Sequence, residues 1–212
     1  MHIPDGFVSA PVAAAGCVVA AGCIAYAVKT TNKKLGEKEV PLMGVLAAFI
    51  FAAQMLNFPI AGGTSGHFLG AALAAILLGP WAGLLIMTCV LAVQCLIFQD
   101  GGLFALGVNI VNMGIVGGFV GYYAHRGGTF LSGGRKRGIL ISGGLAGCLS
   151  IVAASVVCAV ELAVSGTVPL GVALPAMVGI HTLIGIAEGV ITAAVLAVLM
   201  ATRTDLLGLK KV

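Results

Sequence analysis

The first two residues of the chain offer three nitrogen donors for a metal ion. A free α-amine followed by histidine can present the Met1 amine, the His2 main-chain amide once it has lost its proton, and His2 Nδ1. These atoms close a five-membered and then a six-membered chelate ring in one plane. Methionine aminopeptidases generally act only before a small residue, so we expect Met1 to be retained ahead of His2. The N-terminus therefore predicts a planar chelate with one open position.

His67, in the glycine-rich stretch 59–67, is the candidate for the fourth donor. It is the one other histidine that the expected topology puts in a loop on the same side as the N-terminus. Four nitrogens in a square plane suit Ni(II) or Cu(II), whereas zinc prefers a tetrahedron. Met1, His2 and His67 are thus the predicted metal ligands.

The composition indicates which elements must position these donors. Of the 212 residues, 60% are apolar and 8% are charged, against roughly 25% charged in soluble domains. Apolar runs of about 20 residues recur along the chain, the length that a helix needs to cross a hydrocarbon core of ~30 Å. Helices satisfy their own main chain in lipid. We therefore predict an all-α membrane protein, a single polytopic membrane domain over residues 1–212.

About seven transmembrane helices are expected. The third run is short, so it is either a full crossing or a re-entrant segment. The predicted spans are 7–28, 41–58, 67–79, 82–98, 103–123, 138–163 and 175–201.

The basic residues set the expected orientation. With seven spans, all eleven Lys and Arg residues fall on one face, which the positive-inside rule assigns to the cytoplasm. The N-terminus is then outside and the C-terminus cytoplasmic. The eleven residues are Lys29, Lys33, Lys34, Lys38, Arg126, Arg135, Lys136, Arg137, Arg203, Lys210 and Lys211.

Polar side chains inside the spans share one depth. Gln54, Gln94 and Asn109 each lie five or six residues from an outer loop, roughly 8–9 Å down a helix. His181 lies at a similar level in the last span, and Asn112 is expected one turn below Asn109 on the same side. Two interpretations stay open: amide hydrogen bonds that hold the helices together, or a polar pocket opening outward.

His181 and Glu188 are seven residues apart and share a helix face. They are interpreted either as a hydrogen-bonded core pair or as a relay.

Several collinear motifs resemble one family. MHIPDGF at the N-terminus, QMLNFPIAGGTSGH at 54–67, LLGPW at 77–81, QDGG at 99–102 and NIVNM at 109–113 resemble the nickel/cobalt substrate-binding component (the NikM/CbiM family) of energy-coupling-factor transporters. The resemblance implies an N-terminal metal-binding segment (1–6), an extra first helix (about 7–28) and a six-helix core (about 41–201). It also implies Met1, His2 and His67 as the ligands.

The same resemblance implies supporting residues and partners. Ser65, Gln94, Asn109 and Asn112 look like the groups that orient the ligands and close the pocket. Family members work with a transmembrane coupling subunit and two ATP-binding cassette ATPase subunits, and with small accessory membrane subunits in some systems. The chain has no GxxxxGK[ST] phosphate loop, so it is not expected to bind nucleotide, and no nucleic-acid partner is expected.

A small-residue stripe in the first helix resembles a docking surface for the coupling subunit, although packing within this chain explains it equally well. The stripe consists of Ala13, Cys17, Ala21 and Ala25.

The expected function is Ni(II) capture for an ATP-driven uptake transporter in a prokaryotic cell membrane, with no enzymatic activity. The first alternative is the same role for Co(II), as in cobalt uptake for cobalamin synthesis. Two other classes stay open: a self-sufficient metal channel or carrier, and an intramembrane enzyme that uses His181 and Glu188.

Overall fold

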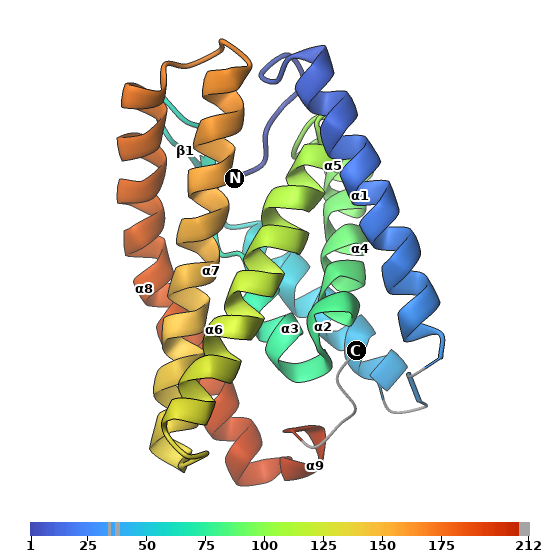
Figure 1. The fold of residues 1–212 in the computed structure, drawn as a ribbon, viewed down its shortest axis with the longest axis vertical. Helices are drawn as coiled ribbons and strands as arrows, with labels where there is room; N and C mark the ends of the chain where they lie inside the picture. The colour runs from blue at the N-terminus through green and yellow to red at the C-terminus, as the bar shows by residue number, and fades with distance from the viewer. Residues whose placement is uncertain (34, 37–38, 208–212) are drawn as a thin grey trace.

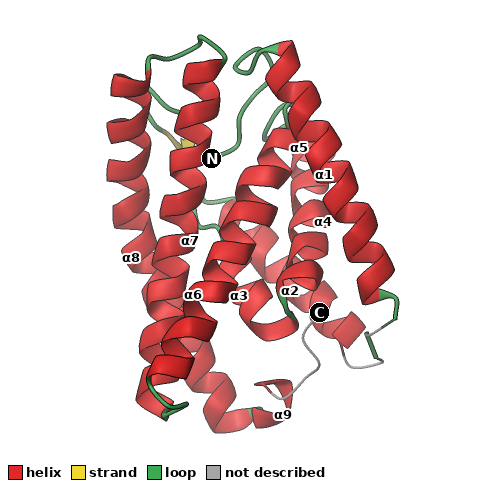
Figure 2. Ribbon diagram, in the orientation of Figure 1, coloured by secondary structure: helices red, strands yellow, loops and turns green. Residues whose placement is uncertain are grey.

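The computed structural model describes residues 1–33, 35–36 and 39–207 as a helical bundle (Figures 1 and 2). One run of helix, Leu106–Leu131, is divided into α5, a π-helix η1 and α6. The elements in order are α1 (Ala10–Thr31), α2 (Glu39–Gln54), β1 (Phe58–Pro59), β2 (Ser65–Gly66), α3 (Ala71–Leu78), α4 (Pro80–Phe98), α5 (Leu106–Asn109), η1 (Ile110–Gly117), α6 (Gly118–Leu131), α7 (Lys136–Val164), α8 (Leu170–Thr202) and α9 (Thr204–Leu207).

In the part of the chain that the structure describes, five helical runs are long and apolar enough to cross a membrane: α1, α4, Leu106–Leu131, α7 and α8. The remaining two expected spans correspond to α2, with 16 residues, and α3, with eight. The protein is therefore a mostly helical, multi-pass membrane protein, and the count of seven crossings stays a prediction. Several expected boundaries were wrong: the second helix ends at Gln54 rather than 58, the fifth run continues to Leu131 rather than ending at 123, and the last helix begins at Leu170, with Pro175 inside it.

The third segment differs most from the expectation of a helix over 67–79. Its helix α3 begins only at Ala71, and residues 67–70 have no regular secondary structure. Gly70 causes the late start: it adopts the left-handed conformation (φ 77°) at the N-cap position, which glycine alone adopts without strain. All eight residues of α3 are buried, so this irregular stretch lies within protein. Irregular main chain at membrane depth is tolerated under that condition.

A two-residue antiparallel pairing, β1 with β2, precedes this stretch. Phe58 pairs with Gly66 and Pro59 with Ser65. The pairing folds residues 58–66 into a hairpin and delivers Ser65 and His67 to the interior of the bundle.

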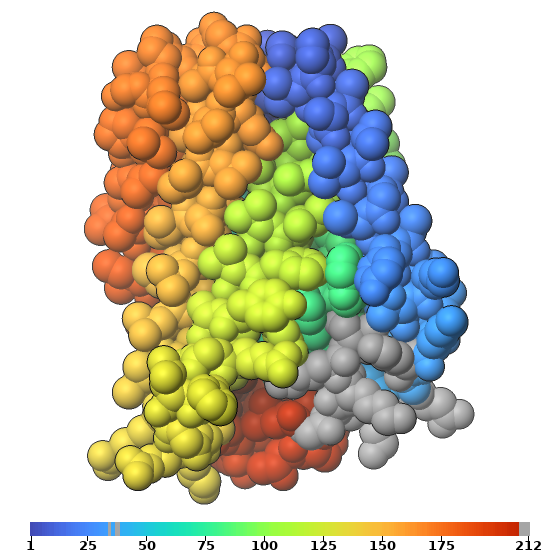
Figure 3. All heavy atoms as spheres, viewed as in Figure 1, coloured from blue at the N-terminus to red at the C-terminus, as the bar shows by residue number. Residues whose placement is uncertain are grey.

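Close approaches of glycine join the long helices, as is common in membranes. The α7–α8 pair is the clearest case, since a Cβ on Gly189 would lie 2.5 Å from the main-chain oxygen of Gly144. In the space-filling view, α1, the run 106–131 and α7 lie side by side on one face (Figure 3).

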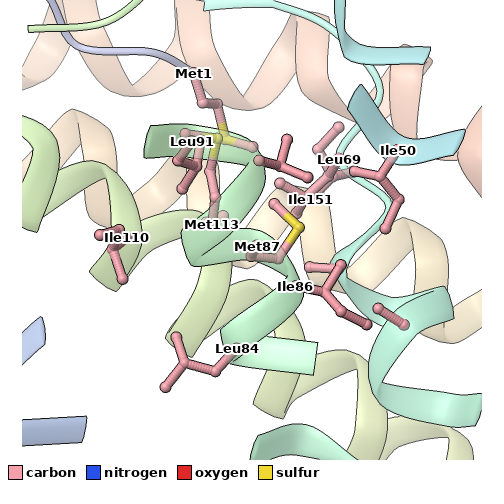
Figure 4. Packing of buried hydrophobic residues seen from close by; sticks show 14 of the residues in the cluster. Met1, Ile50, Leu69, Leu84, Ile86, Met87, Leu91, Ile110, Met113 and Ile151 are labelled. Atoms are coloured by element: carbon pink, nitrogen blue, oxygen red, sulfur yellow. The ribbon is translucent and has the colours of Figure 1, made fainter. Parts of the chain in front are cut away.

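The hydrophobic core extends to the first residues of the chain. The side chains of Met1 and Ile3 are fully buried in the main apolar cluster. In Figure 4 the Met1 side chain reaches toward Leu91 and Met113, on α4 and η1. The N-terminal segment is thus inserted between helices rather than lying on the surface.

The two ends of the bundle differ in charge. One end, at the top of Figure 1, carries residues 4–9, 99–105 and 165–169, and we call it the N-terminal end. The described Lys and Arg residues belong to the other end: they lie at the C-terminal ends of α1, α6 and α8 and around the turn 132–135. Lys34, Lys38, Lys210 and Lys211 lie outside the described residues. We call this second end the basic end.

Candidate metal site

The start of the chain is held against Ser65. The Met1 amine donates hydrogen bonds to the main-chain oxygen of Ser65 and to its Oγ, the latter at 2.9 Å. The His2 main-chain N–H donates to the same Oγ at 3.1 Å. Both main-chain nitrogens of the predicted chelate therefore face one residue of the hairpin.

Ile3 is fixed by three further hydrogen bonds. Its N–H donates to Asn109 Oδ1 (2.9 Å), and its carbonyl accepts from Asn109 Nδ2 (3.1 Å) and from the Gly102 N–H (2.9 Å). The predicted supporting residue Asn109 thus holds the main chain directly behind His2.

Asp5 holds the same segment and was missed by sequence reasoning. Its carboxylate accepts hydrogen bonds from the N–H groups of Leu103, Phe104 and Ala105, at 3.0, 2.8 and 3.3 Å. These amides lead into the helical run 106–131, so Asp5 caps a helix start from another part of the chain. The available signal was an acidic residue in a glycine-flanked N-terminal motif.

The two imidazoles stack, with ring centroids 4.4 Å apart and planes at 24°. His2 Nε2 lies 3.0 Å from Gln94 Oε1, an acceptor, so Nε2 carries the hydrogen and Nδ1 keeps its lone pair. His67 Nδ1 donates to the Phe68 carbonyl at 2.6 Å, which leaves the lone pair on Nε2. These hydrogen bonds leave free His2 Nδ1, the ring nitrogen that the sequence predicted as a donor, and Nε2 of His67, for which the sequence did not specify the nitrogen.

Both selected nitrogens are buried without a hydrogen-bond partner: His2 Nδ1 and His67 Nε2. Buried polar atoms nearly always have partners, and exceptions ask for an explanation such as an ion. His2 Nδ1 also faces the Asp100 carboxylate, 3.4 Å from its Oδ1. A negative charge beside free nitrogen lone pairs favours a cation.

Burial keeps these nitrogens free of protons. It lowers the pKa of the Met1 amine from 8.0 to about 5, and it lowers the pKa of His2 from 6.5 to about 3, with the nearby amine adding to the His2 shift. The pKa of His67 also lies well below its usual range, first through burial and then through the amine and His2. Burial raises the pKa of Asp100. The amine and both rings are therefore unprotonated at neutral pH.

A polar cavity of about 320 Å³ opens beside the site at the N-terminal end. Asn57 donates a 2.7 Å hydrogen bond to Asp100 at its wall. Its lining includes His2, Asn57, Thr64, Ser65, Asp100 and Gly101. Because it reaches His2 and the acidic Asp100, the cavity provides a route by which a hydrated cation can approach.

Other residues of the expected polar layer have different hydrogen-bond partners. Gln54 Nε2 donates to the Leu69 carbonyl (2.7 Å), and Asn112 donates to Glu161 rather than toward the N-terminus. His181 lies near Ser65 and His67, but it does not pair with Glu188: its Nδ1 donates to the Met177 carbonyl, whereas Glu188 accepts from the two main-chain amides just before α3.

Among residues 1–33, 35–36 and 39–207, no three His, Cys, Asp or Glu side chains form a group suited to a metal ion. The chelate predicted from the sequence takes two of its four nitrogens from the Met1 amine and the His2 main chain instead. The structure brings together Met1, His2, Ser65, His67, Gln94 and Asn109, and it leaves Asn112 apart.

Comparisons with known proteins identify the family of the chain. Residues 2–206 match the family CbiM, described as the cobalt uptake substrate-specific transmembrane region. The chain therefore belongs to the CbiM family. A relative in Archaeoglobus fulgidus, provisionally named a fused nickel transport protein NikMN, is 44% identical over 98% of this chain and 68% of its own length. The cobalt transport protein CbiM of Sorangium cellulosum is 34% identical over 98% of this chain and 94% of its own.

A solved structure has the same fold. The crystal structure of a truncated transition metal transporter superposes with a TM-score of 0.88 at 37% identity, covering 95% of this chain and 99% of that one. The protein is accordingly a membrane component of nickel and cobalt uptake of the CbiM/NikM type, a transporter component rather than an enzyme.

Proposed function

We propose that this chain captures Ni(II) through four nitrogens: the Met1 amine, the His2 amide, His2 Nδ1 and His67 Nε2. The observation that carries the proposal is the pair of buried, unpartnered ring nitrogens on imidazoles stacked 4.4 Å apart. The amine and the amide of the same segment lie against Ser65, next to them in the hairpin.

The donor set favours nickel. Four nitrogens in a plane, one of them a deprotonated amide, suit a metal that forms strong in-plane bonds. Cobalt is the alternative, since the family is described by cobalt uptake and a relative is named for it. Both ions would be cargo, not resident cofactors.

The ion enters from outside the cell in this proposal. The described basic residues gather at the end opposite the site, which supports a cytoplasmic basic end and an external metal site. The relatives belong to an archaeon and a bacterium, consistent with a prokaryotic plasma membrane.

Power for uptake is proposed to come from a coupling subunit and two ATPase subunits, with or without a small accessory subunit. The sequence lacks a phosphate-binding loop. Three members of the small-residue stripe in α1, Cys17, Ala21 and Ala25, are exposed and thus available to a partner in the membrane, whereas Ala13 is half-buried.

Metal analysis of the purified protein, combined with its absorption spectrum, tests this function. We expect one nickel per chain with the yellow, diamagnetic signature of a square-planar complex. A paramagnetic, weakly coloured complex, or stoichiometric cobalt with no nickel binding, would contradict the nickel site. Flux of nickel into vesicles that hold this chain alone without ATP would contradict the capture role and favour a channel or carrier.

A further inference from the structure

A carboxylate in the middle of α8 holds the main chain that follows His67. Glu188 Oε2 accepts the Leu69 N–H at 2.8 Å, and Oε1 accepts the Gly70 N–H at 2.9 Å. Only 1% of Glu188 is exposed. Both of its oxygens are therefore committed to two consecutive main-chain groups of a different segment.

The surroundings explain why an acidic side chain is stable there. Burying a carboxylate is costly unless hydrogen bonds replace its water. Glu188 gains two main-chain donors, and it lies at the N-terminal end of α3, where the helix dipole favours a negative group. In return it satisfies the Leu69 and Gly70 amides, which the irregular stretch before α3 would otherwise leave without partners.

Residues 69 and 70 are held from other directions as well. The Leu69 carbonyl accepts the 2.7 Å hydrogen bond from Gln54 on α2, so both main-chain groups of Leu69 are fixed. A Cβ on Gly70 would lie 2.7 Å from the Ile50 side chain, so Gly70 is packed tightly against α2. Only Phe68 separates His67 from this fixed stretch, and the Phe68 carbonyl accepts the hydrogen bond from His67 Nδ1.

We propose that Glu188 is a positioning residue for metal capture: by fixing Leu69 and Gly70 it holds His67 Nε2 opposite the N-terminal chelate. This role rests on the proposed function only in that His67 is taken as a ligand. Glu188 does not touch the ion and acts through the main chain of residues 68–70. It also connects the site to α8, which runs to the basic end.

The variant Glu188→Gln tests this role. Glutamine keeps one acceptor but turns an NH₂ group toward the second amide, so one of the two hydrogen bonds is replaced by a donor–donor contact. We expect nickel affinity to fall by about 10–100-fold, the usual effect of removing a group that orients a ligand. Thr192→Val is the matched control, because Thr192 is fully buried on the same helix one turn later and its hydroxyl has no hydrogen-bond partner among the described residues. The nickel affinity of this variant should equal the parent's.

Two measurements separate positioning from general destabilisation. Adding His67→Ala to Glu188→Gln should weaken nickel binding no further than His67→Ala alone, since both act on one donor. In metal-free protein, the Leu69 and Gly70 amides should exchange hydrogen faster in Glu188→Gln than in the parent. In Thr192→Val they should exchange at the parental rate. Additive losses in the double variant, or parental affinity and exchange in Glu188→Gln, would overturn the proposal.

If Glu188→Gln does not fold, Glu188→Asp tests the role instead. This variant keeps both carboxylate oxygens but places them one methylene further from the Leu69 and Gly70 amides. Its affinity should be reduced, and a parental value would overturn the proposal. If the parent itself binds no nickel, the proposed function fails instead, and amide exchange still reports whether Glu188 holds this segment.

Discussion

The two segments that carry the candidate donors are held in opposite ways. Residues 1–5 are fixed from the N-terminal end of the bundle, by Asn109, Gly102 and the amides that donate to Asp5. Residues 67–70 are fixed from the interior, by Glu188 on α8 and Gln54 on α2. The first segment supplies three proposed donors and the second supplies one, so a complete site requires two separately supported pieces to meet. Ser65 joins them through its bonds to Met1 and His2.

Lengthening the N-terminal segment should have the largest effect. One leucine inserted between Met1 and His2 moves the histidine to position three, and Met1 is still retained because leucine is large. The amine, two amides and the imidazole can then fill the plane without His67. We expect nickel binding to persist while uptake by the full transporter collapses, because the ion is no longer tied to the hairpin. N-terminal acetylation should instead abolish binding by removing the first donor.

Metal content after gel filtration and uptake in cells, measured side by side, separate these two outcomes. Parental uptake by the insertion variant would mean that the N-terminal chelate is not the functional site.

Removing the inner donor should come next. His67→Ala leaves a three-nitrogen chelate, and we expect it to lose most of its bound nickel, more than the ~10–100-fold typical of supporting residues. The protein should remain folded, as judged by its elution and melting temperature. Nickel content equal to the parent's would exclude His67 as a ligand.

Asn109→Leu should loosen only the N-terminal segment. It deletes two of the three hydrogen bonds to Ile3, and we expect nickel affinity to drop about 10–100-fold. Asn112→Leu is the comparison, because Asn112 contacts Glu161 instead, and its loss should be smaller. Nickel affinity is measured by competition with a chelator. Equal losses of affinity in the two variants would mean that both asparagines support the site to the same extent.

The pH dependence of nickel affinity tests whether the Met1 amine is buried. Above pH 5 the amine and the rings are already unprotonated, so binding displaces one proton, that of the His2 amide, and affinity should fall about tenfold per pH unit. As pH drops through the amine pKa of about 5, a second proton competes and the fall should steepen. Nickel titrations between pH 8 and 4.5 locate the break. A break near pH 8, the usual pKa of the amine, would show that the N-terminus is solvated.

Asp5→Asn should have the smallest effect. Asn keeps one acceptor but loses the charge that caps three amides, at a cost of about 1 kcal/mol, or roughly fivefold in nickel affinity. A calorimetric titration can resolve that difference. A loss as large as that of His67→Ala would mean that Asp5 does more than hold the segment.

The sequence predicted the parts of this molecule that follow from composition and local chemistry. Helices occur within all seven expected spans, and in the described part of the chain five helical runs are long and apolar enough to cross a membrane. Met1, His2, Ser65, His67, Gln94 and Asn109 meet as expected. The features that the sequence could not predict depend on contacts between segments far apart in the chain. Only the fold shows that Glu188 and Gln54 support the irregular start of the third segment.

Asn109 and Asn112 were expected on the same side of a helix, but they have different partners for a geometric reason. A separation of three residues places both on one side of an α-helix, but they lie at the junction of α5 and the π-helix η1. Hydrogen bonding from i to i+5 widens the turn, and the two amides reach Ile3 and Glu161 respectively.

The π-helix also bears on which insertions and deletions this helical run can tolerate during evolution. Because a π turn holds one residue more than an α turn needs, Ile110–Gly117 behaves like a helix that has absorbed an insertion. Loss of a single residue there would restore an ordinary α-helix and leave the segments on either side close to their present orientation. The same loss in α6 would instead rotate everything on one side by roughly 100° relative to the other. The hydrophobic run would still look intact in the sequence, yet Asn109 could no longer face the N-terminal segment if the rest of the helix kept its packing. A one-residue gap in α6 would therefore separate the fold of this protein from its proposed metal binding, whereas the same gap in η1 would leave both in place.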